Sequence, residues 1–124
     1  MTRIFSRDTG AALVEFAIIT PLLLLLVFGI IEFGRAYNAQ NTLTHAAREG
    51  AREYAITQDP VAGETAAKDA ATSLRSSDIT VTLSACDPGQ PATVNLQYPF
   101  QLQVAFFPIT NFTMQSEGVM RCGG

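Results

Sequence analysis

A long apolar stretch near the start of the chain most constrains its structure. Residues 11–31 contain a single charged side chain, Glu15, close to one end. An α-helix over these residues would be about 30 Å long, which matches the hydrocarbon thickness of a bilayer. Pro21 lies inside the stretch, and a membrane helix tolerates a proline, usually with a kink. The sequence therefore predicts a transmembrane helix over residues 11–31.

The flanking charges predict how this helix is oriented. Arg3 and Arg7 precede the apolar stretch, with Asp8 as the only acidic residue before it. Positive charge is enriched on the cytoplasmic side of membrane helices. We therefore expect a cytoplasmic N-terminus, and a domain spanning residues 32–124 in the periplasm or outside the cell.

The composition argues against several classes of function. The net charge is −3 and no basic stretch suggests nucleic acid as a partner. The two cysteines lack the spacing of a metal site. No phosphate-binding loop or nucleophile elbow is present. We expect no enzyme activity, no cofactor, no metal and no small-molecule substrate, and we expect the only histidine, His45, to lie at the surface or in packing.

The helical pattern continues beyond the apolar stretch, over residues 40–54. Small or apolar residues recur along one stripe there: Ala39, Leu43, Ala46 or Ala47, Gly50 and Tyr54. Ala46 and Gly50 form a small-xxx-small pair, which allows another backbone to approach closely. Arg48 and Arg52 lie on a neighbouring face. They are part of a packing motif or of a solvated charged face, whereas Glu32, Arg35 and Glu49 read as ordinary flanking charges.

The rest of the chain predicts an α+β domain with a second short helix and a small antiparallel sheet of about three strands. Asp59 and Pro60 are typical of a helix start, and this helix should end near Ser76. Alternating residues predict strands over 79–85, 94–104 and 112–121. Pro99 indicates a sheet edge or a bulge, and we expect a second bulge near Gly118. The apolar connection 105–109 is expected to be buried, with a partner surface as the alternative.

The two cysteines end strands of this sheet. Cys86 follows the first predicted strand and Cys122 follows the third. An oxidising compartment would favour a disulfide between them. Two free buried thiols are the alternative.

The start of the apolar stretch resembles a processing signal. The residues T-G-A-A-L-V-E-F follow a short basic segment and lead into the apolar helix. This arrangement resembles the type IV pilin signal, in which a prepilin peptidase cuts after the glycine. The resemblance implies that residues 1–10 are a cytoplasmic leader, that cleavage separates Gly10 from Ala11, and that Glu15 becomes the fifth residue of the mature chain.

Further residue blocks resemble one family in particular. The order VEFA, P-LLLLL, EFGR and A-A-R-E-G-A-R is similar to the TadE-like family of the tight-adherence (Flp) pilus machinery. The resemblance covers about residues 10–55. It implies a pilin-like fold and a pseudopilin, a processed minor component rather than the bulk filament subunit. Its implied partners are a prepilin peptidase, other pilins or pseudopilins, and inner-membrane platform proteins.

The resemblance also implies a role for Glu15. Cleavage would create a positive amine at Ala11, one helical turn from the Glu15 carboxylate. In pilins the carboxylate meets the amine of a neighbouring subunit; alternatively, Glu15 reaches the lipid headgroups. Two other functions stay open: an unprocessed single-span membrane protein with an exterior protein-binding domain, and a secreted enzyme with a cleaved signal peptide.

Overall fold

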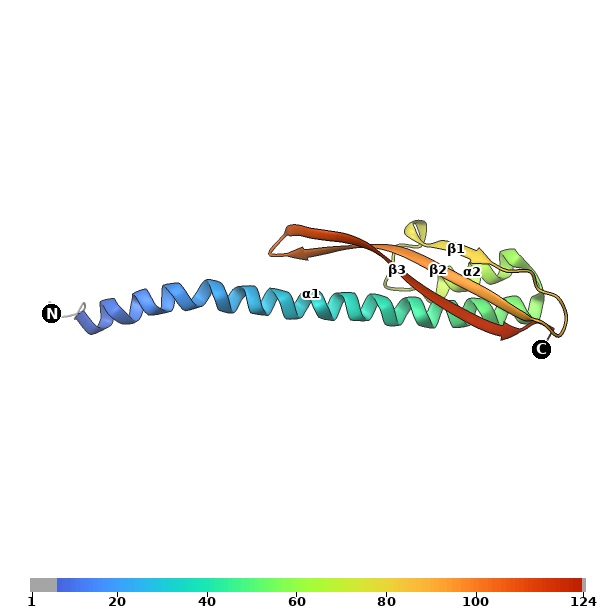
Figure 1. Cartoon of the computed structure of the whole chain (residues 1–124), viewed down its shortest axis with the longest axis horizontal. Helices are drawn as coiled ribbons and strands as arrows, with labels where there is room; N and C mark the ends of the chain where they lie inside the picture. The colour runs from blue at the N-terminus through green and yellow to red at the C-terminus, as the bar shows by residue number, and fades with distance from the viewer. Residues whose placement is uncertain (1–6, 124) are drawn as a thin grey trace.

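The computed structural model describes residues 7–123, so residues 1–6 of the predicted leader lie outside the described part. The chain forms two α-helices, a short 3₁₀ helix and three strands, which confirms the α+β prediction (Figure 1). In order these are α1 (Arg7–Thr57), α2 (Pro60–Ala70), η1 (Ser76–Asp78), β1 (Thr80–Leu83), β2 (Pro91–Val104) and β3 (Phe107–Arg121).

Helix α1 is 51 residues long and joins the apolar segment to the distal domain without a break. It runs through Pro21, and the Thr20 hydroxyl donates a hydrogen bond of 2.6 Å to the carbonyl of Phe16. In Figure 1 the blue N-terminal part of α1 projects alone, while its C-terminal part lies beside α2 and the sheet. The predicted continuation of the helix beyond residue 31 is therefore correct.

The three strands form an antiparallel sheet in the order β1-β2-β3. Strand β1 is short and pairs only with the part of β2 from Val94 to Gln97. Strand β3 pairs along the whole of β2, up to Val104 opposite Phe107. One edge of β2 is consequently unpaired beyond Gln97, and Pro99 lies there, as its predicted edge position requires.

The core lies between the C-terminal part of α1, helix α2 and the sheet. Close approach depends on glycine at two places. A Cβ on Gly50 would lie 2.7 Å from the Cβ of Ala67 in α2, and a Cβ on Gly118 would collide with the carbonyl of Ala47. Gly118 therefore lets β3 lie directly on α1. It pairs regularly with Val94, so the bulge predicted near Gly118 is wrong, and the register shift lies between Leu102 and Gln103 instead.

Helix α2 begins as predicted but ends earlier. The Asp59 carboxylate caps it by accepting a hydrogen bond of 3.0 Å from the Val61 amide, and Pro60 is the first helical residue. The helix ends at Ala70 rather than near Ser76. The chain then turns, with the Leu74 amide donating to the Ala71 carbonyl, and this turn returns the chain to bury Ile79 against the core.

The apolar connection after β2 differs from its prediction as a buried loop. Strand β3 begins at Phe107 rather than near residue 112, so only Ala105 and Phe106 connect the two strands. Phe106 and Phe107 are 90% and 74% exposed. The expectation of burial is wrong because the hairpin extends past β1 and α2, and no element of the described chain covers its tip (Figure 1).

Candidate functional site

The residues of the predicted processing signal lie in the first turns of α1. Gly10 and Ala11 are both helical, and Ala11 is exposed. A Cβ added to Gly10 would meet nothing within 4 Å, so packing does not require glycine here. Glycine weakens a helix interior by about 1 kcal/mol relative to alanine. The helix is therefore locally weaker at this position than an alanine would make it.

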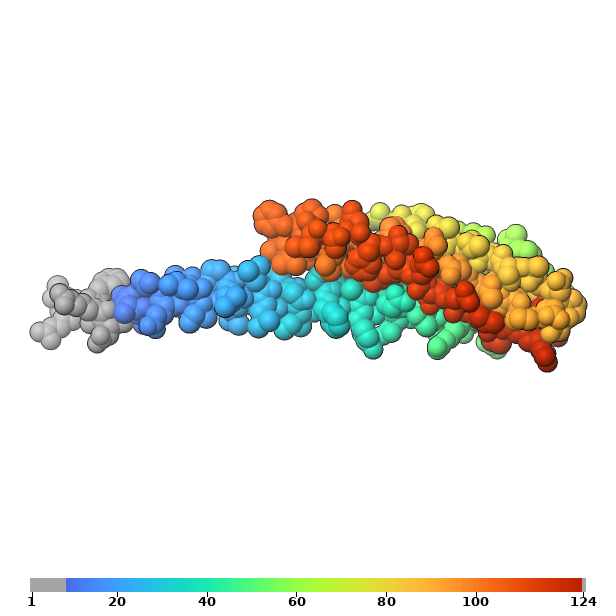
Figure 2. Space-filling model, viewed as in Figure 1, coloured from blue at the N-terminus to red at the C-terminus, as the bar shows by residue number. Residues whose placement is uncertain are grey.

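The apolar part of α1 makes no core of its own. It is long and apolar enough to cross a membrane, and none of its most apolar window is buried. The exposed side chains include Leu13, Ile18, Leu22, Leu25 and Ile30. In Figure 2 the blue part of the helix is bare along the visible face. Lipid or other proteins must cover this surface, because exposing so much apolar area to water is unfavourable.

Glu15 lies on this bare surface. It is exposed and makes no ion pair with any of residues 9–123. It follows Ala11 by four residues, a rise of about 6 Å along the helix. The carboxylate is thus available to a group outside the folded chain. The structure places Gly10, Ala11 and Glu15 within two helical turns of one another.

A second polar group lies where the bare part of α1 meets the domain. The Glu32 carboxylate accepts hydrogen bonds of 2.6 and 3.2 Å from the Arg35 guanidinium, and it also accepts one from the backbone amide of Gln103. Arg35 donates a further bond of 2.8 Å to the Gln101 carbonyl and lies 4.6 Å from the centre of the Phe100 ring.

The Glu32–Arg35 ion pair bonds to the part of the β2 edge that β1 does not reach. Gln101 and Gln103 lie in the part of β2 that extends beyond β1, where no other strand of residues 7–123 pairs with this edge. Their backbone groups bond to side chains of α1 instead. These hydrogen bonds, together with the contact of Arg35 with the Phe100 ring, hold the hairpin against the helix.

The electrostatics of the pair follow from this geometry. The hydrogen bond from Arg35 lowers the pKa of Glu32 below its usual value; burial opposes this shift and the Gln103 amide supports it. The same hydrogen bond raises the pKa of Arg35. Glu32 is only 6% exposed, so its interpretation as an ordinary flanking charge, and that of Arg35, is wrong. Glu49 is partly exposed and lies 4.0 Å from Arg52, as a flanking charge would.

The four residues of the predicted helix packing motif separate into two faces. Ala46 and Gly50 are buried, and Gly50 faces Gly63 and Ala67 of α2 in the same chain. Arg48 and Arg52 are exposed on the other side, together with His45. The small residues thus pack inside the domain, while the arginines face outward.

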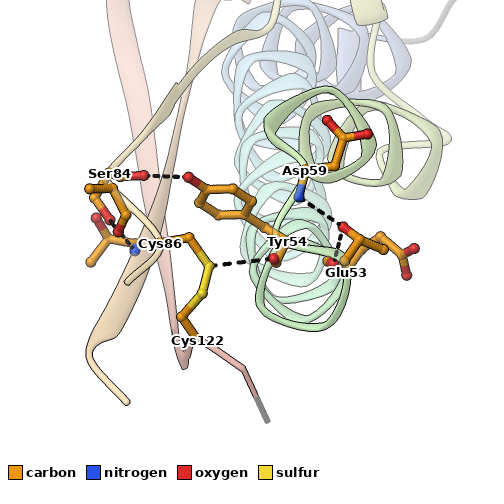
Figure 3. Close-up of a disulfide and its surroundings, with 9 residues drawn as sticks. Glu53, Tyr54, Asp59, Ser84, Cys86 and Cys122 are labelled. Atoms are coloured by element: carbon orange, nitrogen blue, oxygen red, sulfur yellow. Dashed lines mark hydrogen bonds between the residues drawn. A yellow bond between two sulfur atoms is a disulfide. The ribbon is translucent and has the colours of Figure 1, made fainter. Parts of the chain in front are cut away.

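The two cysteines are joined at the far end of the domain. Cys86 and Cys122 form a disulfide with 5.5 Å between their Cα atoms, an ordinary separation. Figure 3 shows the bond beside the last turns of α1, where the Tyr54 hydroxyl donates to the Ser84 carbonyl at 2.7 Å. The Gly123 amide also donates to the Ala55 carbonyl. These contacts fasten the C-terminal end of the sheet to α1.

Sequence reasoning missed the clasp formed by Glu32, Arg35 and β2. The three-residue spacing of Glu32 and Arg35 places them on one helix face, and this spacing was visible in the EFGR block. Their partners on β2 were not visible, because that contact joins residues 71 positions apart in the chain. Within residues 9–123, no group of three or more metal-ligating side chains gathers that could hold an ion.

Comparison with known proteins bears on the N-terminal part of the chain. Residues 10–52 match the model of a family described as TadE-like protein. No curated protein and no solved structure matches the chain. The matched residues include the predicted processing signal, the bare apolar surface, the Glu32–Arg35 pair and the small residues that pack against α2. The match confirms the resemblance seen in the blocks VEFA, EFGR and AAREGAR, and residues 10–52 are similar to the TadE-like family.

Proposed function

We propose that this protein is a pseudopilin of a tight-adherence pilus apparatus. A prepilin peptidase would cut it after Gly10, and it would then join other pilins, pseudopilins or inner-membrane platform proteins through the N-terminal part of α1. It would act as a structural component rather than as an enzyme. The domain of residues 32–124 would lie outside the cytoplasm.

One observation carries this proposal above the others. The TadE-like segment contains a helix whose apolar half is bare and bears one carboxylate, Glu15, the fifth residue after the predicted cut, which makes no ion pair with any of residues 9–123. A plain membrane anchor needs the apolar residues but has no use for Glu15, because a charge within a bilayer costs about 2.5–3.5 kcal/mol or more. A new amine at Ala11 offers the opposite charge that makes such a carboxylate tolerable.

The cleavage step is tested by the mass of the mature chain. We expect co-expression with a prepilin peptidase to yield a chain that starts at Ala11. Gly10→Leu should block this, because a bulky side chain would occupy the cleavage position. Gly29→Leu is the matched control. Neither position has an atom within 4 Å of an added Cβ, so both variants should fold. A wild-type chain that keeps Met1 in the presence of an active peptidase would contradict the proposal.

The assembly step is tested at Glu15. We expect Glu15→Gln to insert and to be cleaved normally but to be lost from complexes with the pilus components. Glu117→Gln is the control, since it removes one exposed carboxylate from β3. Copurification after crosslinking would measure recruitment. Equal recruitment of both variants would contradict the role of Glu15 in assembly and favour its alternative, a carboxylate that reaches the lipid headgroups.

A further inference from the structure

The tip of the β2–β3 hairpin is an unusual surface for an exterior domain. Residues 105–109 read Ala-Phe-Phe-Pro-Ile, and Phe106, Phe107 and Ile109 are 90%, 74% and 60% exposed. No charged residue occurs anywhere from position 88 to position 116, so all of β2 and the tip-proximal part of β3 are uncharged. A water-exposed loop ordinarily carries polar or charged side chains, and an aromatic cluster there indicates a contact surface.

The hairpin points back toward the apolar part of its own helix. In Figures 1 and 2 its orange-red end runs along α1 toward the N-terminus and reaches the blue part of the helix. A shallow cleft joins the two elements, lined by Phe28 and Ile31 of α1 and by Ala105 and Phe106 of the hairpin. The tip is therefore level with residues that belong to the apolar segment.

The depth of the hairpin tip relative to a membrane follows from its position along the apolar segment, residues 11–31. Phe28 lies three residues before Ile31, or about 4.5 Å inside the end of the segment at 1.5 Å per residue. If residues 11–31 cross a bilayer, the tip reaches the outermost part of the hydrocarbon, on the side of the domain. Gln101 and Asn111, further up the hairpin, would then lie among the headgroups. Aromatic side chains are enriched at this boundary in membrane proteins.

The clasp on α1 maintains this level. Glu32 and Arg35 hold Gln101 and Gln103 of β2 by hydrogen bonds, so the hairpin cannot slide along the helix without breaking them. Glu32 directly follows Ile31, the last residue of the apolar segment. The hairpin is thus attached to α1 at the point where the segment ends.

The backbone of the tip also indicates a role beyond folding. Ala105 and Phe106 both have positive φ, 51° and 69°. Two-residue hairpins with this geometry strongly prefer Asn-Gly or Asp-Gly. A large residue in the left-handed region costs about 1–2 kcal/mol. The chain places an almost fully exposed phenylalanine where glycine would be more stable, which indicates that the ring contributes something outside the folded domain.

We infer that the hairpin tip inserts Phe106, Phe107 and Ile109 into the leaflet of the membrane on the side of the domain. The protein would then be inserted in the bilayer at two places, through α1 and through the hairpin tip. A lipid surface is favoured over a second copy because the chain itself holds the tip at this depth, whatever its neighbours. The inference requires residues 11–31 to span a membrane, but it requires neither cleavage after Gly10 nor assembly.

Depth-dependent fluorescence quenching tests the inference. The chain contains no tryptophan, so one introduced residue reports alone. The full-length protein would be reconstituted in phosphatidylcholine vesicles brominated either near the headgroup or near the chain end. We expect Phe106→Trp to lose most of its emission with the shallow bromine and little with the deep one. Val119→Trp, at an exposed position further along β3, should keep its emission in both.

A third reporter separates the inference from its premise. Leu24→Trp lies in the apolar segment and should be quenched most by the deep bromine. If Leu24→Trp is quenched and Phe106→Trp is not, the tip lies outside the membrane and the inference is wrong. A Phe106→Trp emission that shifts to the blue only as protein density rises would indicate coverage by a second copy and would also overturn it. Absence of quenching at both positions would overturn the span and the inference together.

Discussion

The two halves of α1 differ in which side chains they bury. The N-terminal half carries large apolar side chains such as Leu22 and Ile30, which are exposed, and only Phe28, beside the hairpin tip, is half-buried among those of residues 11–31. The C-terminal half buries mostly small ones, including Ala46, Ala47 and Ala51, which are fully buried. The N-terminal half thus presents an apolar surface to its surroundings. The C-terminal half lets the backbones of α2 and β3 approach the helix closely. In this helix, burial follows side-chain size and position rather than hydrophobicity.

The largest effect should come from opening the disulfide, which fastens the far end of the C-terminal half. We expect the double variant Cys86→Ser, Cys122→Ser to lose roughly 2–4 kcal/mol of domain stability. The N-terminal half should keep its helicity, because no contact of the bond reaches it. Chemical unfolding in detergent, followed by circular dichroism, measures both. Equal stability of the variant and the oxidised wild type would show that the bond contributes nothing.

The next largest effect should come from adding one methyl group at the contact between β3 and α1. Gly118→Ala would push a Cβ into the carbonyl of Ala47 and separate β3 from α1. We expect a loss of about 1–3 kcal/mol in the free energy of unfolding.

The matched control adds the same methyl group to the other half. Gly29→Ala meets nothing within 4 Å, and its stability should equal or slightly exceed that of the wild type, since alanine favours helix. If both variants lose the same stability, the two halves do not differ in packing as described.

The junction between the halves should respond to a change at Glu32. Glu32→Ala would remove the acceptor for the Gln103 amide and the partner of Arg35, at a cost of about 1–2 kcal/mol. Glu32→Gln keeps one oxygen as an acceptor and should cost less. Amide hydrogen exchange at the β2–β3 hairpin would locate the effect, and protection unchanged in Glu32→Ala would contradict the clasp.

The pH dependence of this contribution has a definite sign. The pKa of Glu32 is lowered in the folded protein by the hydrogen bond from Arg35. Its stabilising contribution is therefore complete above its ordinary pKa of 4.5 and is lost as the pH falls through the lower folded value. The stability difference between the wild type and Glu32→Gln should shrink on acidification and stay constant near neutral pH.

The smallest expected effect is an increase in the stability of the domain. Phe106→Gly relieves the positive φ of the turn and should stabilise the domain in detergent by about 0.5–1 kcal/mol. Thermal unfolding measures this. A loss of stability in detergent would mean that contacts of the ring, with the micelle or with the domain, outweigh the strain of the turn.

Local patterns predicted the elements well. The alternation in 94–104 predicted β2, and Asp59 with Pro60 predicted the start of α2. Both signals lie within a few residues of chain, so sequence reasoning could read them. The residue blocks around the apolar stretch likewise carried the resemblance to the TadE-like family, and the family model matches the same part of the chain.

Contacts between distant segments explain the errors. The role of Gly118 depends on Ala47, and the burial of Glu32 depends on Gln103, each about 70 positions away in the chain. The end of α2 at Ala70 depends on the need to return Ile79 to the core. The exposure of residues 105–109 depends on how far the hairpin extends beyond β1. None of these can be read from a local pattern.

The continuity of α1 has a mechanical consequence. From Pro21 to the end of the helix is roughly 54 Å at 1.5 Å per residue, so a tilt of about 5° at Pro21 would move the far end by roughly 5 Å. Pro21 cannot donate a backbone hydrogen bond, which makes this turn the softest point of the rod. Small reorientations of the apolar half at Pro21 would thus be amplified at the disulfide-bonded end of α1.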